Sequence, residues 1–251
     1  MHVPVLLHEV LETLNPKPGE FFIDGTLGAG GHARAIIKKI GPTGTFLGVD
    51  RDPRAVVSLK AGEMTDGNVT LLSASYATLP ELLISQKLGK ADGVLLDLGT
   101  SSDQLDGSAL GRGFSFKTDE PLLMTYSDDE PTVAQVLATI SESELSEIIR
   151  TLGEEKYADK IAQAIISAEK EAPIVTTGRL AEVVRSAVPV SYERGRIHPA
   201  TRTFQALRIY ANHELEHLKL FLEALPKILK FGCANTTAEV CDRQKHIDRY
   251  E

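Results

Sequence analysis

The chain of 251 residues has no tryptophan, only three methionines and two cysteines, and no excess of basic residues. Two cysteines, Cys233 and Cys241, are too few for a disulfide framework, which favours an intracellular, reducing compartment. The formal net charge of -8 argues against a dedicated binder of duplex DNA. Any contact with nucleic acid is therefore expected to come from a local basic patch.

Long apolar runs are also absent, and none approaches the length that a bilayer-spanning helix needs. The N-terminal stretch has no basic leader, and Glu9 and Glu12 interrupt its apolar residues, unlike a signal peptide. Together these absences predict a soluble, cytoplasmic protein. Cys233, Cys241 and His246 match no strong zinc-binding spacing and have no evident fourth ligand, so no metal site is expected.

The N-terminal part of the chain alternates between strand-like and helical patterns four times. Short apolar runs typical of buried strands are separated by stretches of helical spacing. The expected strands are 20–23, 45–49, 69–72 and a run within 91–98, and the expected helices are 5–14, 32–40, 53–60 and 79–87. This alternation predicts an α/β fold, a doubly wound parallel sheet that is buried on both faces and binds ligands at the carboxyl ends of its strands.

After Leu98 the pattern changes to a stretch rich in Gly, Ser and Asp and then to helical spacing. The expected helices are 132–138, 142–152, 156–170 and 177–187, followed by one long helix over 199–225. In the long helix, apolar residues at three- and four-residue steps indicate core packing: Phe204, Leu207, Ala211, Leu215, Leu218, Leu222 and Leu225. The predicted domains are a discontinuous core, 1–108 and 200–251, and a mainly helical insertion, 109–199, that recognises the substrate.

The stretch DGTLGAGGH follows the first expected strand and has the spacing of a nucleotide-binding turn. Gly28, Gly30 and Ala33 satisfy the pattern G-x-G-x-x-G/A, and Asp50 ends the next expected strand. Glycines permit a tight turn and close approach of a ligand to backbone N–H groups, and the acid accepts hydrogen bonds from ribose hydroxyls. The pattern favours a cofactor of the adenosine type, and the alternative is a tight turn without a ligand.

Two acidic residues favour a cationic cofactor over a dinucleotide. Asp24 precedes the glycines, where it would repel a pyrophosphate but suits the amino and sulfonium groups of S-adenosylmethionine. Asp97 ends the fourth expected strand beside the same cleft, where a polar residue can align a target amine with the methyl group. The alternative for Asp97 is a solvated carboxylate at the end of a strand.

One segment is basic in this acidic chain. RGRIHPATRTFQALR contains four arginines, one histidine and no acid, which suits contacts with phosphate. The candidate RNA contacts are Arg194, Arg196, His198 and Arg202. The alternatives are arginines that solvate the start of a helix and a histidine that caps it.

The loop GRGFSFK is a second candidate for RNA contact. Arg112, Ser115 and Lys117 add polar groups there, and Phe114 and Phe116 could stack an unpaired base. The alternative is that the two phenylalanines anchor the loop in the core.

Six motifs in the same order give the chain a family resemblance: HVPVLLHEVLE, DGTLGAGGH, GVDRDP, LLDLGTSSDQLD, RGFSF and RIHPATRTFQALRI. Residues 2–225 resemble the bacterial small-subunit ribosomal RNA (cytosine-N4) methyltransferases of the RsmH/MraW type. The resemblance implies a Rossmann-like core with a helical insertion, S-adenosyl-L-methionine as donor, and as target the N4 amine of a cytidine in the decoding region of 16S ribosomal RNA in the small subunit. It also implies donor-binding positions, with Asp97 next to the transferred methyl group as the catalytic residue: Gly30, Gly31, His32, Asp50, Tyr76, Asp97 and Gln104.

The sequence departs from the family pattern at two main places. PLLMTY stands where the family usually reads PLDMRM, and after Leu229 the chain reads KFGCANTTAEVCDRQKHIDRYE instead of a Gly-rich turn, an apolar strand and SFHSLEDR. We expect two terminal strands of the sheet to be missing, through a shifted reading frame or a naturally decayed end. An exposed sheet edge would invite pairing with another chain, so a homodimer stays an open alternative. A non-catalytic remnant that binds RNA or the ribosome, and an NAD-linked oxidoreductase, are the alternative functions.

Overall fold

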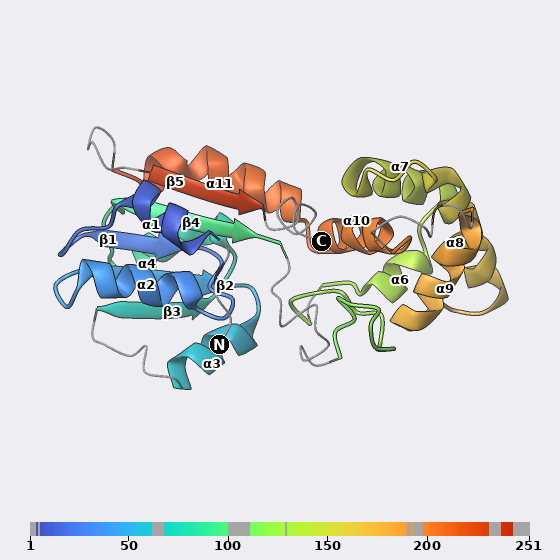
Figure 1. Ribbon diagram of the computed structural model, residues 1–251, viewed down its shortest axis with the longest axis horizontal. Helices are drawn as coiled ribbons and strands as arrows, with labels where there is room; N and C mark the ends of the chain where they lie inside the picture. The colour runs from blue at the N-terminus through green and yellow to red at the C-terminus, as the bar shows by residue number, and fades with distance from the viewer. Residues whose placement is uncertain are drawn as a thin grey trace. The chain divides into compact units, whose positions relative to one another are not determined.

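The computed structural model divides the chain into two compact units, Met1–Gly99 with Glu216–Glu251, and Thr100–Leu215. We call them the sheet unit and the helical unit (Figure 1). The structure describes residues 4, 6–61, 68–99, 111–128, 130–189, 192, 198–230 and 237–242, the last range by its backbone only.

The sheet unit is built on five parallel strands in the order β3-β2-β1-β4-β5. The strands are β1 (Phe21–Asp24), β2 (Thr45–Asp50), β3 (Val69–Ser73), β4 (Gly93–Leu98) and β5 (Thr237–Asp242). All four residues of β1 are buried, and the first five of β4 are as well, as expected for central strands of a doubly wound sheet. The predicted α/β class and the four predicted strands are confirmed.

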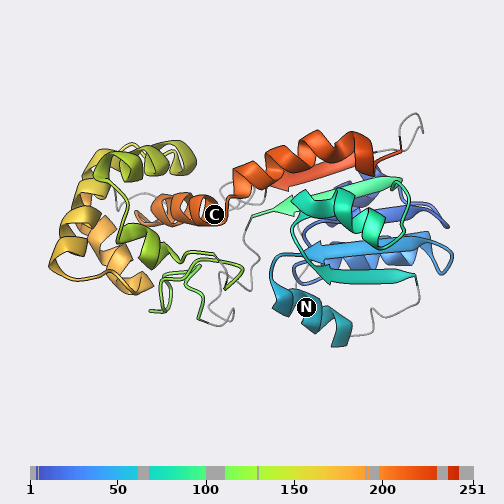
Figure 2. The ribbon, with the colours of Figure 1, turned by 180° about the vertical axis from the view of Figure 1, so that it is seen from behind.

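Helices cover both faces of this sheet (Figure 2). One face packs against α1 (Leu7–Leu14), α2 (Gly31–Ile40) and α3 (Pro53–Ala61), and the other against α4 (Leu79–Ser85) and α11 (Glu214–Ile228). Successive strand residues alternate between the two clusters, with Phe22 on the side of α2 and Ile23 on the side of α11. Burial on both sides holds the carboxyl ends of the strands in one rigid edge.

The fifth strand corrects a prediction. The sequence predicts no strand after Leu229, yet Thr237–Asp242 pairs in parallel with β4, with Asp97 opposite Cys241. The reason is that β4 is a buried strand whose outer backbone groups need hydrogen-bond partners, so backbone pairing can recruit a segment of low apolarity. Cys233 and His246 lie outside the described residues.

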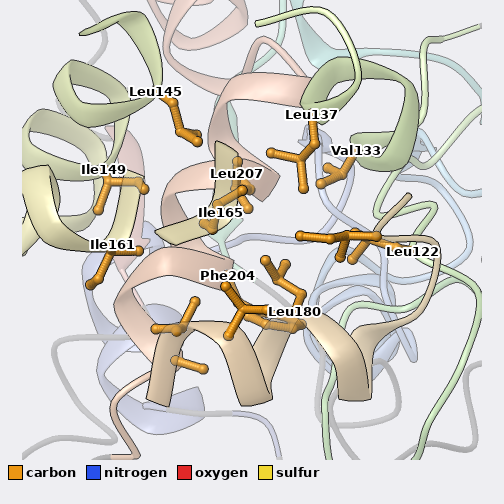
Figure 3. Close-up of a cluster of buried hydrophobic side chains, with 14 of the residues drawn as sticks. Leu122, Val133, Leu137, Leu145, Ile149, Ile161, Ile165, Leu180, Phe204 and Leu207 are labelled. Carbon is orange, nitrogen blue, oxygen red and sulfur yellow. The ribbon is translucent and has the colours of Figure 1, made fainter. Parts of the chain in front are cut away.

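The helical unit has a separate apolar core (Figure 3). Its helices are α6 (Val133–Leu137), α7 (Glu142–Gly153), α8 (Ala158–Glu171), α9 (Thr177–Ala187) and α10 (Thr201–Ala211). Hydroxyl side chains begin three of them, since Thr132, Ser141 and Thr176 each accept a hydrogen bond from a first-turn amide. The four helices predicted between 132 and 187 are confirmed, and for α6, α7 and α9 these caps explain where the helix starts.

The long helix predicted over 199–225 is wrong, because two helices stand in its place. Backbone φ is +51° at His213, a left-handed conformation that ends α10. Asn212 is fully buried there: its Nδ2 donates to the carbonyls of Met124 (2.7 Å) and Arg208 (2.8 Å), and its Oδ1 accepts from the amide of Tyr126 (3.1 Å). Tertiary hydrogen bonds thus overrule the helical spacing at this point.

The break also moves the boundary of the insertion. Phe204, Leu207 and Ala211 belong to the core of the helical unit, so α10 lies in that unit and not in the predicted core segment 200–251. Only part of the predicted apolar stripe continues along α11: Leu218 and Leu225 pack against the core of the sheet unit, whereas Leu215 and Leu222 are exposed. Within the described residues, no helix is both long and apolar enough to cross a membrane.

Candidate functional site

Three carboxylates gather at the carboxyl edge of the sheet. Asp24 ends β1, Asp50 ends β2, and Asp97 is the penultimate residue of β4. Because β2, β1 and β4 are parallel neighbours, these side chains lie at the same edge. Asp24 and Asp97 are buried, and Asp50 is half-buried. The edge of the sheet predicted to bind the ligand therefore carries three acidic side chains, and we call it the acidic edge.

The glycine-rich turn connects β1 to α2 beside this edge. Gly28 and Gly30 have φ of +49° and +74°, left-handed conformations that glycine adopts without strain. A Cβ on Gly30 would lie 2.5 Å from Leu59 Cδ2, and one on Gly31 would lie 2.2 Å from Pro4 Cγ. The local packing thus requires glycine at these positions. Since the N-cap of α2 is Gly30, no side chain caps the amino end of this helix.

Asp50 holds this turn in place. Its Oδ2 accepts a hydrogen bond from the amide of Gly28 (2.8 Å), and its Oδ1 accepts from the amide of Asp52 (2.8 Å). Burial raises the pKa of Asp50, and the two backbone hydrogen bonds oppose that rise. A carboxylate has four acceptor positions, so the predicted bonds to ribose hydroxyls remain open to it. The sequence did not reveal that Asp50 also anchors the glycine turn.

The carboxyl of Asp24 is strongly perturbed by its surroundings. Burial raises its pKa to about 7, helped by the neighbouring carboxylates of Asp97 and Asp50 and opposed by the amide of Thr26 and by His32. A cation bound near this edge would favour the ionised form of Asp24. The sequence prediction that Asp24 suits a cationic ligand therefore agrees with the electrostatics of the edge.

His32 and Asp97 form a buried pair. Nε2 of His32 lies 3.6 Å from Oδ2 of Asp97, and both side chains are almost completely enclosed. Neither ring nitrogen of His32 has a hydrogen-bond partner among the described residues. Buried polar nitrogens are nearly always hydrogen-bonded in the functional state of a protein, so this imidazole fits a site that receives a ligand.

Tyr76 lies in the turn η1 (Tyr76–Thr78) that follows β3. Its buried ring packs edge-on against Phe221 (centroid distance 5.8 Å) and His217 (6.4 Å) of α11. A Cβ on Gly25, at the start of the glycine turn, would lie 3.0 Å from the Cβ of Tyr76. Tyr76 is thus beside the turn, and its contact with the donor stays a prediction. Gln104 lies outside the described residues.

The predicted RNA contacts belong to the helical unit, and the structure describes two of them. His198 is exposed, and its Nδ1 accepts a hydrogen bond from the amide of Ala200 (3.1 Å) before α10. Arg202 lies in the first turn of α10, with Nη1 3.4 Å from the carbonyl of Glu154 and 3.4 Å from the hydroxyl of Tyr192. Arg194 and Arg196 lie outside the described residues.

The loop GRGFSFK separates into structural and accessible residues. Arg112 pairs with Asp128 (2.7 Å) and donates to the carbonyl of Thr125. Phe114 is buried and stacks on Tyr126, so Arg112 and Phe114 fold the loop.

Ser115 of this loop is buried, and its hydroxyl accepts a hydrogen bond from the amide of Lys117. Phe116 is half-buried and lies 4.6 Å from the ring of His198. The Phe116–His198 ring pair is the part of this region that could stack on a base. Among the described residues, no group of His, Cys, Asp and Glu is placed to hold a metal ion.

Comparison with known proteins finds relatives that match most of this chain. The ribosomal RNA small subunit methyltransferase H of Nitrosomonas europaea is 45% identical over 231 residues, which cover 91% of this chain and 72% of the relative. The protein of the same name from Trichlorobacter lovleyi is 45% identical over 233 residues, covering 92% and 74%. A SAM-dependent O-methyltransferase structure from Thermotoga maritima is 17% identical and covers 39% of this chain and 36% of its own, with a TM-score of 0.31.

The family comparison extends over nearly the whole chain. Residues 1–235 match the MraW methylase family, a range that includes the glycine turn, the acidic edge and all helices of the helical unit. The chain belongs to the MraW methylase family.

Proposed function

We propose that this chain is an S-adenosylmethionine-dependent methyltransferase that methylates the N4 amine of a cytidine in the decoding region of 16S ribosomal RNA. The observation that carries the proposal is the family match over residues 1–235. The relatives that share about 45% of its residues are named as methyltransferases of small-subunit ribosomal RNA. The carboxylates of the acidic edge suit a cationic methyl donor.

The residues at the edge fit the methyl donor. A dinucleotide would bring a pyrophosphate against Asp24, whereas S-adenosylmethionine brings a sulfonium and an ammonium group. We assign the turn at Gly30, Gly31 and His32 to the methionine portion of the donor, and Asp50 to the ribose hydroxyls. Tyr76 and Gln104 complete the set that we assign to the donor.

In the proposed reaction Asp97 aligns the cytosine amine with the methyl group of the donor. When bound, S-adenosylmethionine supplies an electrophilic methyl carbon and a neutral thioether leaving group. The Asp97 carboxylate accepts a hydrogen bond from the cytosine amine, which points its lone pair toward that carbon. As the N–C bond forms, the amine becomes acidic, and Asp97 holds the proton that it loses. The imidazole of His32 lies 3.6 Å from Asp97 and lines the same site.

The helical unit recognises the RNA in this proposal. Arg194, Arg196 and Arg202 contact phosphates, and the exposed His198 with Phe116 stacks on a base near the target. The target cytidine leaves its stack to reach Asp97, as bases do in other enzymes that modify nucleic acids. A local patch of this size suits RNA that is already folded in a small ribosomal subunit.

The first test is calorimetric titration of the chain with S-adenosylmethionine, with NAD as the control, followed by transfer of a labelled methyl group to small ribosomal subunits. We expect binding of the methyl donor alone. The substitution Asp97→Asn keeps the size of the side chain but removes the charge, and should lower kcat by about a hundredfold or more.

Two outcomes would contradict the proposal. Binding of NAD in place of S-adenosylmethionine would support an oxidoreductase. Binding of the methyl donor without transfer to subunits or to 16S ribosomal RNA would support the non-catalytic alternative.

A further inference from the structure

The backbone ladder between β1 and β4 ends at the acidic edge. The amide of Gly25 donates to the carbonyl of Leu95 (2.9 Å), after which β1 turns away into the glycine turn. The next amide of β4 that faces β1 is that of Asp97, and it donates to the side-chain Oγ1 of Thr26 at 2.7 Å. A hydroxyl therefore continues the ladder by one bond, at the residue that we place next to the target amine.

Thr26 is itself held by Asp24. The amide of Thr26 donates to Asp24 Oδ1 (2.9 Å), and the hydroxyl of Thr26 lies 3.5 Å from the same oxygen. The hydroxyl can thus accept from Asp97 and donate to Asp24 at once, which fixes the direction of its hydrogen. Because Asp24 is buried at the end of a central strand, this anchor has little freedom to move.

We propose that Thr26 is a positioning residue for methyl transfer: its hydroxyl fixes the main chain of Asp97 and so the place of the Asp97 carboxylate. The inference rests on the proposed function, since it concerns the same reaction. Displacing a catalytic group by about 1 Å can lower a rate by roughly a hundredfold without abolishing binding. Thr26 acts through Asp97 and is assigned no contact with donor or RNA.

Two matched substitutions separate the hydroxyl from the shape of the side chain. Thr26→Val keeps the branched shape and removes the hydrogen bond, and Thr26→Ser keeps the hydroxyl and removes one methyl group. Amide hydrogen exchange of the donor-free protein, followed by NMR, reports the bond directly. In Thr26→Val we expect the Asp97 amide to exchange at least about tenfold faster, which corresponds to about 1.4 kcal/mol. In Thr26→Ser it should stay near the wild-type rate.

Kinetics with small ribosomal subunits give the second readout. We expect Thr26→Val to lower kcat by about tenfold to a hundredfold, with the Kd for S-adenosylmethionine within about twofold of wild type. Thr26→Ser should recover most of kcat. A general loss of folding would instead change the Kd and the melting temperature together with kcat.

The inference is overturned if Thr26→Val keeps the wild-type kcat, if the donor Kd weakens as much as kcat falls, or if serine fails to rescue. A wild-type chain that transfers no methyl group would refute the proposed function and would also remove the reaction that Thr26 is inferred to serve. An unchanged exchange rate of the Asp97 amide in Thr26→Val would refute the inference alone.

Discussion

At the scale of single residues, the buried carboxyl of Asp24 makes folding depend on pH. Its pKa rises from 3.8 to about 7 on folding because burial disfavours the charge. The folded state therefore holds a proton that the unfolded state has released between pH 4 and 7. Because the folded state binds this proton more tightly, protonation of Asp24 stabilises the fold. The stabilisation is fully present below about pH 4 and is lost as the pH rises through 7.

We therefore predict that Asp24→Asn becomes more stable relative to the wild type as the pH rises from 4 to 8, by a few kcal/mol at most. Asparagine keeps the Oδ1 acceptor for Thr26 and cannot ionise. Urea unfolding of both proteins across this range measures the difference. His32, Asp50 and Asp97 face the same edge and are unchanged in Asp24→Asn. A difference that stays constant with pH would contradict the assignment.

The residues of the acidic edge show what a sequence can and cannot predict. Asp24, Asp50 and Asp97 were predictable, because strand-like runs end at each of them and parallel strands bring their ends together. The role of Thr26 was not, since its bond to the amide of Asp97 joins residues 71 positions apart. Hydrogen bonds of this kind depend on the three-dimensional register of β1 against β4, which no local pattern contains.

At the scale of elements, helical spacing predicted the helices up to residue 187 closely and missed the break between α10 and α11. The spacing of apolar residues continues through 199–225, but Asn212 and His213 divide the stretch into α10 and α11. β5 was missed for the opposite reason: its residues are weakly apolar, and its place is set by the backbone of β4. Helix and strand propensity are local properties of the sequence, whereas tertiary hydrogen bonds determine where a helix or strand ends.

The division at Asn212 gives a prediction about the helical unit. Asn212→Ala should destabilise this unit by about 2–4 kcal/mol, because the buried amide of Tyr126 and carbonyl of Met124 would each lose a partner. Urea unfolding monitored by circular dichroism gives the change. Gln205→Ala is the matched control on α10, since within the described part of the chain the side chain of Gln205 makes one long hydrogen bond, 3.4 Å to the carbonyl of Leu152. If both substitutions changed the free energy of unfolding equally, the buried hydrogen bonds of Asn212 would not contribute more than the long one of Gln205.

At the scale of the whole molecule, the buried apolar residues divide between the two units: two clusters line the faces of the sheet, and one fills the helical unit. The described residues that we assign to the donor all lie in the sheet unit, whereas His198 and Arg202, which we assign to RNA, lie in the helical unit. The family assignment and the α/β class followed from the sequence, but the boundary between the units did not, because α10 looked like the start of the core. A protein with two cores need not unfold in a single step.

This division predicts that S-adenosylmethionine stabilises one unit and a core substitution can weaken the other. Donor at a hundred times its Kd should raise the stability of the sheet unit by about 2.7 kcal/mol. Ile161→Ala removes a fully buried side chain of α8 and should destabilise the helical unit by about 2–5 kcal/mol while the donor Kd stays the same. Calorimetric melting with and without the donor, on both proteins, resolves the two effects.

The reciprocal substitution completes this test. Leu47→Ala removes a fully buried side chain of β2, so it should lower the transition that responds to the donor and leave the other in place. If the donor shifted both transitions equally, or if Ile161→Ala weakened donor binding as much as it destabilised the protein, the two cores would be acting as one folding unit. Separate responses would show that the sheet unit can bind the donor while the state of the helical unit changes, which suits the role in RNA recognition that we propose for the helical unit.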